Sequence, residues 1–99
     1  MTRTNYEVSI EKFDRSPDGA DWYYALGLAG ETGEVIEIIK KDNRVKDWRR
    51  PLEPGALALE LGDVLWYITR LANKHGFTLA DLMRLNVEKL SARHAVGPK

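Results

Sequence analysis

Two pairs of acidic residues are the side chains in this sequence best suited to chemistry. Glu31 and Glu34 form E-x-x-E in GETGEV, and Glu60 and Asp63 form E-x-x-D in LELGDV. Residues three apart on a helix share a face, with Cβ atoms about 5–6 Å apart. If two such helices pack together, four carboxylates converge in a mostly apolar seam, where uncompensated charge is costly. A divalent metal ion is therefore the best candidate for a ligand of this group.

The apolar surroundings of these acids distinguish them from ordinary surface carboxylates. Glu31 and Glu60 fall inside the apolar arcs of their helices, and Glu34 and Asp63 fall at the edges. The arcs consist of Leu28, Val35, Ile38 and Ile39, and of Leu57, Val64, Tyr67, Ile68 and Leu71. Structural ion pairs are an alternative role for single acids. They do not explain why each acid has an acidic neighbour one turn away, where like charges oppose ionisation.

The donor types indicate a hard cation. Four carboxylates without a nearby His or Cys favour Mg²⁺, Mn²⁺ or Ca²⁺ over Zn²⁺. Gly33 and Gly62, each just before the second acid of its pair, are unfavourable in a helix interior. Close approach of another helix or of a ligand would explain them, and sequence drift is the alternative.

A third group of polar side chains lies near the C-terminus. Asn86 falls inside an apolar arc, and Lys89 and Arg93 follow on the same side of the expected helix. An amide and two cations suit an anionic ligand. The alternative is that the cations extend to water while Asn86 caps a backbone group. Beside a carboxylate site we favour phosphate binding, because bound Mg²⁺ commonly takes phosphate oxygens as ligands.

Four helices must position these residues, and the sequence contains no strand pattern. We expect them at about residues 5–13, 21–42, 54–74 and 78–94, which makes the fold class all-α. Thr4 with Glu7 and Thr78 with Asp81 have the spacing of N-terminal caps, and Gly76 suits a C-terminal cap.

A basic connector joins the second and third helices. It contains Arg44, Lys46, Arg49 and Arg50 around Trp48. Two interpretations stay open at this point. The connector is either a solvated loop with one anchored aromatic ring or an electropositive rim beside an anionic ligand.

Composition limits the remaining possibilities. Ninety-nine residues predict one domain, covering residues 1–99, with a core thin enough that burial against a second copy is plausible. Fifteen basic and fifteen acidic residues give zero net charge, which makes nucleic-acid binding an unlikely function. The absence of cysteine excludes disulfides and thiolate metal sites. Without a membrane-length apolar run or a signal-peptide pattern, we expect a cytoplasmic protein that does not bind membranes.

Three sequence blocks resemble a known family. GLAGETGEVIEIIKK, ALELGDVLWYITRLA and LNVEKLSARH resemble a MazG-like nucleotide pyrophosphohydrolase of the all-α NTP pyrophosphatase superfamily, with a core at about residues 22–94. The two acidic pairs match the metal-binding signature of this family, and N-x-x-K-L-x-x-R matches its C-terminal helix. Thr32 stands where Ala is common, a departure that removes no ligand.

The resemblance implies Mg²⁺-dependent hydrolysis, with Mn²⁺ possible, of a (deoxy)nucleoside triphosphate to the monophosphate and pyrophosphate. It also implies a four-helix fold whose bundle is completed in a homodimer or homotetramer. The implied metal ligands and catalytic residues are Glu31, Glu34, Glu60 and Asp63; the implied substrate-binding residues are Asn86, Lys89 and Arg93. Trp22, Trp66 and Tyr67 are candidates for a base pocket, although such aromatics are more often core residues.

Two other function classes compete with a hydrolase. A catalytically silent, metal-stabilised helical interaction module would keep the fold but could lose an acid, so the four intact acids favour the enzyme. A nucleic-acid-binding regulator would depend on the short basic connector, and zero net charge makes this the weakest alternative. The patterns do not indicate which base or sugar is preferred.

Overall fold

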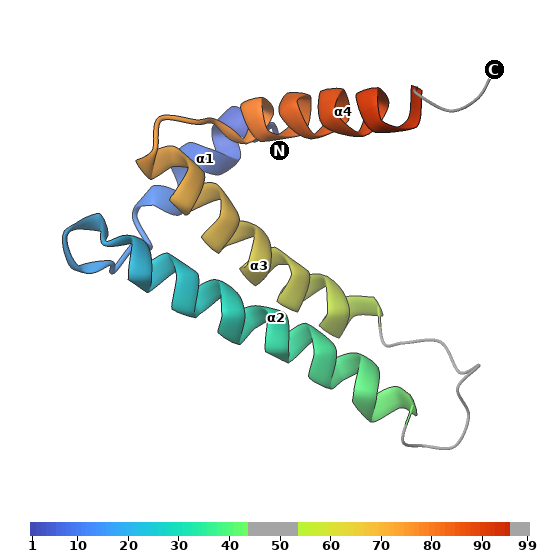
Figure 1. The fold of residues 1–99 in the computed structure, drawn as a ribbon. Coiled ribbons are helices and arrows are strands. Elements are labelled where there is room, and N and C mark those ends of the chain that lie inside the picture. Colours follow the sequence, from blue (N-terminus) through green and yellow to red (C-terminus); the bar gives the residue numbers. More distant parts are fainter. Residues whose placement is uncertain (44–53, 96–99) are drawn as a thin grey trace.

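The protein is all-helical throughout the part of the chain that the computed structural model describes, residues 1–43 and 54–95. The elements are α1 (Arg3–Glu11), a 3₁₀ turn η1 (Pro17–Gly19), α2 (Asp21–Asn43), α3 (Pro54–Lys74) and α4 (Leu79–Ala95), as Figure 1 shows. This confirms the predicted class and the approximate position of each helix. The basic residues around Trp48 lie outside the described residues.

The first helix begins earlier than expected. Thr2 is its N-cap, and the Thr2 hydroxyl accepts a hydrogen bond from the Asn5 backbone nitrogen at 3.1 Å. The predicted capping pair of Thr4 and Glu7 is therefore wrong. The Glu7 carboxylate instead accepts a hydrogen bond from the Leu79 backbone nitrogen, at the first turn of α4.

The caps predicted around the α3–α4 turn are confirmed. The Thr78 nitrogen donates to the Asp81 carboxylate at 2.9 Å, and the Asp81 nitrogen donates to the Thr78 hydroxyl at 3.1 Å. Gly76 follows α3 with φ +85°, a conformation that side chains disfavour. These local signals set the point at which the chain turns from α3 into α4.

Helices α2 and α3 form an antiparallel pair, and α1 packs near the C-terminal end of α3 (Figure 1). A close approach joins the pair. A Cβ atom placed on Gly27 would lie 2.1 Å from Cε1 of Tyr67. Gly27 is therefore the position that lets the Tyr67 ring lie directly against α2, beside the turn that carries Glu31.

The core of the single chain is small. Among the described side chains, four are buried: Ile10, Tyr24, Thr69 and Ala72. Large apolar residues on α2, α3 and α4 are exposed, including Leu26, Ile36, Leu59, Met83 and Val87. The Cα radius of gyration is 16.8 Å, whereas a compact domain of about 100 residues has about 13 Å. The chain is thus more open than a self-sufficient domain of its length.

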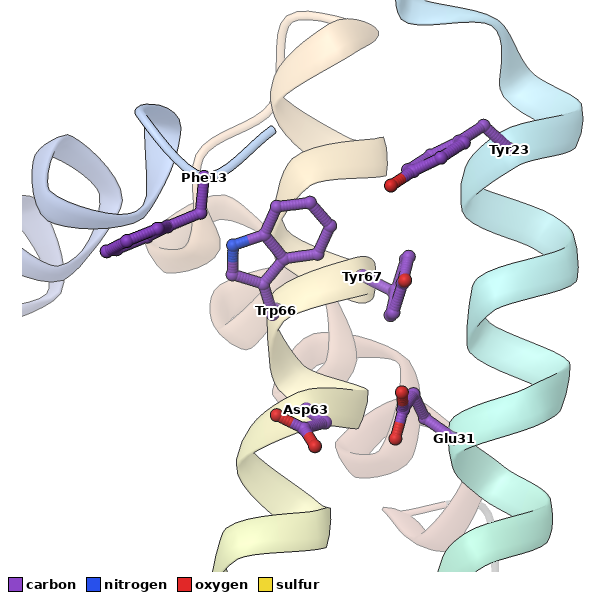
Figure 2. A pocket seen from close by; sticks show the side chains of 6 residues that line it. All are labelled: Phe13, Tyr23, Glu31, Asp63, Trp66 and Tyr67. Carbon is purple, nitrogen blue, oxygen red and sulfur yellow. The ribbon is translucent and has the colours of Figure 1, made fainter. Parts of the chain in front are cut away.

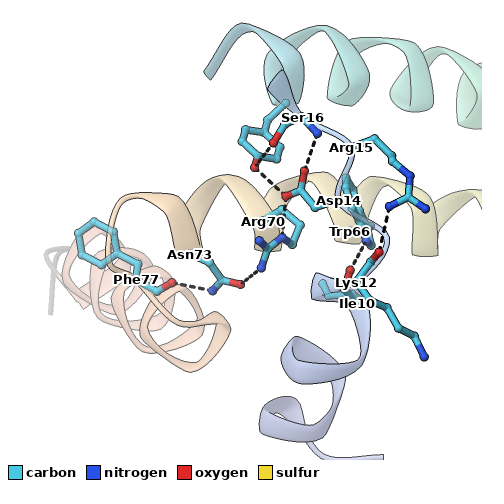
Figure 3. A network of polar contacts seen from close by, with 10 residues as sticks. Ile10, Lys12, Asp14, Arg15, Ser16, Trp66, Arg70, Asn73 and Phe77 are labelled. Atoms are coloured by element: carbon cyan, nitrogen blue, oxygen red, sulfur yellow. Dashed lines mark hydrogen bonds and ion pairs between the residues drawn. The ribbon is translucent and has the colours of Figure 1, made fainter. Parts of the chain in front are cut away.

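A polar network fixes the segment between α1 and α2 to α3 (Figure 3). The Asp14 carboxylate accepts hydrogen bonds from Tyr24 Oη at 2.7 Å, Arg70 Nε at 3.0 Å and the Ser16 nitrogen at 2.8 Å. Burial alone would raise the pKa of Asp14, but these hydrogen bonds outweigh it and lower the pKa to about 2. Asp14 is therefore ionised at neutral pH and stabilises the junction of α1, α2 and α3.

No helix in the described ranges is both long and apolar enough to cross a membrane.

Candidate metal centre and adjoining cleft

Three of the four predicted acids meet between α2 and α3. Glu31 comes from α2, and Glu60 and Asp63 come from α3. One carboxylate oxygen from each lies within 4.8 Å of the others. Figure 2 shows Glu31 on α2 and Asp63 on α3 at the same level of the helix pair. The antiparallel packing of two helices, each with acids on its inner face, is what brings these side chains together.

The fourth acid, Glu34, lies outside this group. It is exposed on α2, one turn beyond Glu31. Its negative charge nevertheless contributes to the electrostatics of Glu31. The structure therefore gathers three carboxylates closely, with the fourth at the margin.

The electrostatics of the group favour a bound cation. Burial and the negative charges of Asp63 and Glu60 raise the pKa of Glu31 above its ordinary value. Among the described residues, no ion pair neutralises Glu31, Glu60 or Asp63. Within residues 1–43 and 54–95 the structure thus shows no ion pair of the kind considered from the sequence, and a bound cation would relieve the mutual repulsion of the acids.

The geometry of the three carboxylates also fits a divalent ion. All donors are oxygen atoms, as hard cations require. Two ligands on opposite sides of Mg²⁺, each about 2.1 Å from the ion, lie about 4.2 Å apart. At most one pair of three ligands can lie on opposite sides of the ion, and neighbouring ligands lie about 3 Å apart. The carboxylate oxygens, which lie within 4.8 Å of one another, would therefore have to move inward around a bound ion.

Packing among the described residues does not explain the two glycines beside the acids, Gly33 and Gly62. A Cβ atom on Gly33 or Gly62 would meet no described atom within 4 Å. Close approach of another helix among the described residues is therefore not the reason for them. A ligand or a second copy as the reason stays a hypothesis.

An aromatic cleft of about 370 Å³ adjoins the acids (Figure 2). It is lined by Glu31 and Asp63 and by four rings: Phe13, Tyr23, Trp66 and Tyr67. Trp66 and Tyr67 were candidates for a base pocket in the sequence analysis. Trp22 was also a candidate, but it does not line this cleft and is 56% exposed.

Two of the cleft residues, Phe13 and Tyr23, were not identified from the sequence. Phe13 lies in the turn after α1 and is 59% exposed. Helix α1 also contributes a titratable group near the acids: burial, and then the negative charge of Asp63, raise the pKa of Tyr6. Only the tertiary packing of α1 against α3 reveals these contributions.

The predicted phosphate-binding residues lie apart from the acids within one chain. Asn86, Lys89 and Arg93 are all exposed on α4. Helix α4 leaves the end of α3 and runs away from α2, whereas Glu31 and Asp63 lie midway along their helices (Figure 1). A single chain therefore does not bring the two groups together.

An antiparallel helix pair with three clustered acids beside an aromatic cleft defines an all-α protein whose oxygen donors could hold a divalent metal ion. Comparison with known sequences identifies the family. The sequence profile of the MazG nucleotide pyrophosphohydrolase domain matches residues 23–96, and the chain belongs to this family.

One relative comes from a bacteriophage. The chain is 40% identical over 76 residues to the Gene 37 protein of Mycobacterium phage L5, and the match covers 76% of this chain and 67% of that protein. No solved structure matches the chain.

Proposed function

We propose that the protein is a Mg²⁺-dependent nucleoside triphosphate pyrophosphohydrolase, cleaving a (d)NTP to the (d)NMP and pyrophosphate. The observation that carries this proposal is the group of three carboxylates, all oxygen donors within 4.8 Å, beside an aromatic cleft. Membership of the MazG nucleotide pyrophosphohydrolase family supports the reaction class.

Glu31, Glu60 and Asp63 would hold the ion, and Glu34 would join them by rotation of its side chain from the neighbouring turn. An ion held by these residues, Mg²⁺ or Mn²⁺ in its place, would supply neutralisation of phosphate charge and would lower the pKa of the attacking water. A carboxylate not fully engaged by the ion would accept the proton of the attacking water. Glu34, at the margin of the group, is best placed for that role.

We also propose a homodimer or homotetramer. The exposed apolar residues of α2, α3 and α4 need a partner surface, and a second copy is the simplest source. In such an assembly Lys89 and Arg93 would reach the phosphates held at the acids of a neighbouring copy, and Asn86 would orient a ligand group. Their exposure in one chain is consistent with that role.

The test is product analysis with Mg²⁺ and a panel of canonical and modified (d)NTPs. Pyrophosphate and monophosphate should form in equal amounts, and reaction in ¹⁸O-labelled water should label the monophosphate, because attack falls on the α-phosphorus. Glu34→Gln should abolish turnover, whereas Glu37→Gln on the exposed side of α2 should not. Orthophosphate with a nucleoside diphosphate would refute the reaction type.

A second variant separates substrate binding from metal binding. Lys89→Ala should raise KM for the nucleotide but leave the stabilisation by Mg²⁺ intact, because Lys89 is not a metal ligand. Stabilisation by Mg²⁺ without turnover of any nucleotide would instead support the metal-stabilised interaction module.

A further inference from the structure

One wall of the aromatic cleft comes from a segment that precedes the matched domain. The family match begins at residue 23, whereas Phe13 lies in the turn after α1. In Figure 2 the Trp66 indole lies between Phe13 on one side and Tyr67 on the other. The cleft is therefore shared between the family domain and an element of this chain outside it.

The backbone around Phe13 is held firmly in place. The Phe13 nitrogen donates to the Ile10 carbonyl at 3.1 Å, and the same carbonyl accepts a hydrogen bond from Trp66 Nε1 at 3.4 Å. The next residue, Asp14, is fixed by Arg70 and Tyr24. Contacts on both sides of Phe13 thus hold it at the mouth of the cleft, so its position does not depend on burial of its own ring.

Three rings of the cleft form a packed row, and the fourth ring, Phe13, has the Lys12 ammonium over it, 5.3 Å from the ring centroid. Trp66 contacts Tyr67 edge to face, with centroids 4.8 Å apart, and Tyr67 contacts Tyr23 at 6.2 Å. Phe13 forms no ring pair with any described residue, although it lines the same cleft as Trp66. More than half of its surface is exposed. A planar aromatic ligand that enters beside Phe13 would bury apolar surface that the chain leaves in water.

We propose that Phe13 and Trp66 bind the nucleobase of the substrate, so that the N-terminal segment supplies part of the base-binding site. This inference rests on the proposed function, since the phosphates must lie at the acids at the other side of the cleft. Stacking on aromatic rings suits any base, because each has a π face. Shape and edge contacts within the cleft then decide which base is preferred.

The test compares full-length variants with Mg²⁺ and the nucleotide that the wild type hydrolyses best. Phe13→Ala should raise KM by about ten- to a hundredfold with little change in kcat, as expected for a lost stacking contact. Phe13→Tyr, which keeps an aromatic ring, should have a KM close to that of the wild type. The inhibition constant of inorganic tripolyphosphate, which has phosphates but no base, should stay unchanged. The matched control is Phe77→Ala, which removes another exposed phenylalanine that does not line this cleft.

Each outcome separates the inference from the proposed function. An unchanged KM in Phe13→Ala, with an active wild type, would overturn the inference alone. Loss of tripolyphosphate inhibition together with a fall in kcat would also overturn it, because Phe13 would then act on the fold. If the wild type hydrolyses no nucleotide, equilibrium binding of nucleosides to wild type and Phe13→Ala decides: equal affinity, or no binding by either protein, overturns the inference.

Discussion

The Asp14 carboxylate, on a side chain that is 10% exposed, provides a quantitative test of how the segment beside the cleft is held in place. Its folded pKa of about 2, against an ordinary value of 3.8, corresponds to about 2 kcal/mol of stability at neutral pH. A carboxylate with a depressed folded pKa stabilises the protein above its unfolded pKa. That contribution is lost as the pH falls from about 4 towards 2, and about half of it is gone by pH 3.

The perturbation is Asp14→Asn, which removes the charge that faces Arg70 but keeps the size of the side chain. We expect the variant to be less stable by about 2 kcal/mol at pH 7, because Asn cannot reproduce the charge-assisted hydrogen bonds. The difference from wild type should narrow between pH 4 and pH 3. Urea unfolding followed by circular dichroism at pH 7, 5, 4 and 3, at one protein concentration, measures it.

The control for Asp14 is Asp21→Asn. Asp21 also forms an ion pair with Lys74 at 2.8 Å and lies 2.9 Å from His75 Nε2, within hydrogen-bond distance, but its side chain is 57% exposed. Water screens exposed pairs, so the loss should be much smaller. An Asp14→Asn variant as stable as wild type at pH 7, or a difference that does not change with pH, would refute the reasoning.

Three further outcomes follow from the packing and the site. Gly27→Ala should destabilise the protein by about 1–3 kcal/mol, since its Cβ would overlap the Tyr67 ring. The added Cβ of Gly30→Ala meets no described atom within 4 Å, so this variant should be more stable by up to about 1 kcal/mol. Thermal unfolding compares the two variants with the wild type. Mg²⁺ should raise the melting temperature of the wild type. Glu60→Gln should lose this response while remaining helical by circular dichroism, and the control Glu37→Gln should retain the response. An unchanged response in Glu60→Gln would contradict the metal site. Light scattering at micromolar concentration should give a dimer or larger assembly, and an active monomer would exclude the proposed oligomer.

Local sequence signals predicted the helices well because their causes are local. The reciprocal Thr78–Asp81 cap and the positive φ at Gly76 depend on a few neighbouring residues, and both were predicted. The start of α1 was not predicted correctly, because Thr2 and Thr4 both have a hydroxyl group that could cap the helix. Tertiary contacts determine which of the two is the N-cap. Glu7 does not complete a cap with Thr4, because its carboxylate accepts a hydrogen bond from the Leu79 backbone nitrogen of α4.

The site was only partly predictable for a related reason. The three-residue spacing of each acidic pair, with the apolar arcs, correctly placed Glu31 near Glu60 and Asp63. It could not tell that Glu34 stays at the margin, because rotation about the helix axis depends on packing. Nor could any spacing rule bring Phe13 to the cleft, since the segment from α1 to α2 is positioned by contacts between distant residues.

The Glu7–Leu79 contact makes the last helix depend on the first. The amide of Leu79 is among the four that open α4 and have no acceptor within the helix. A carboxylate 72 residues earlier in the chain accepts its hydrogen. The first turn of α4 is therefore complete only after the chain has closed a long loop, a slow step relative to helix formation. Fraying of that turn, seen as rapid hydrogen exchange at Leu79, would report that α1 has come loose while the remaining helices are still intact.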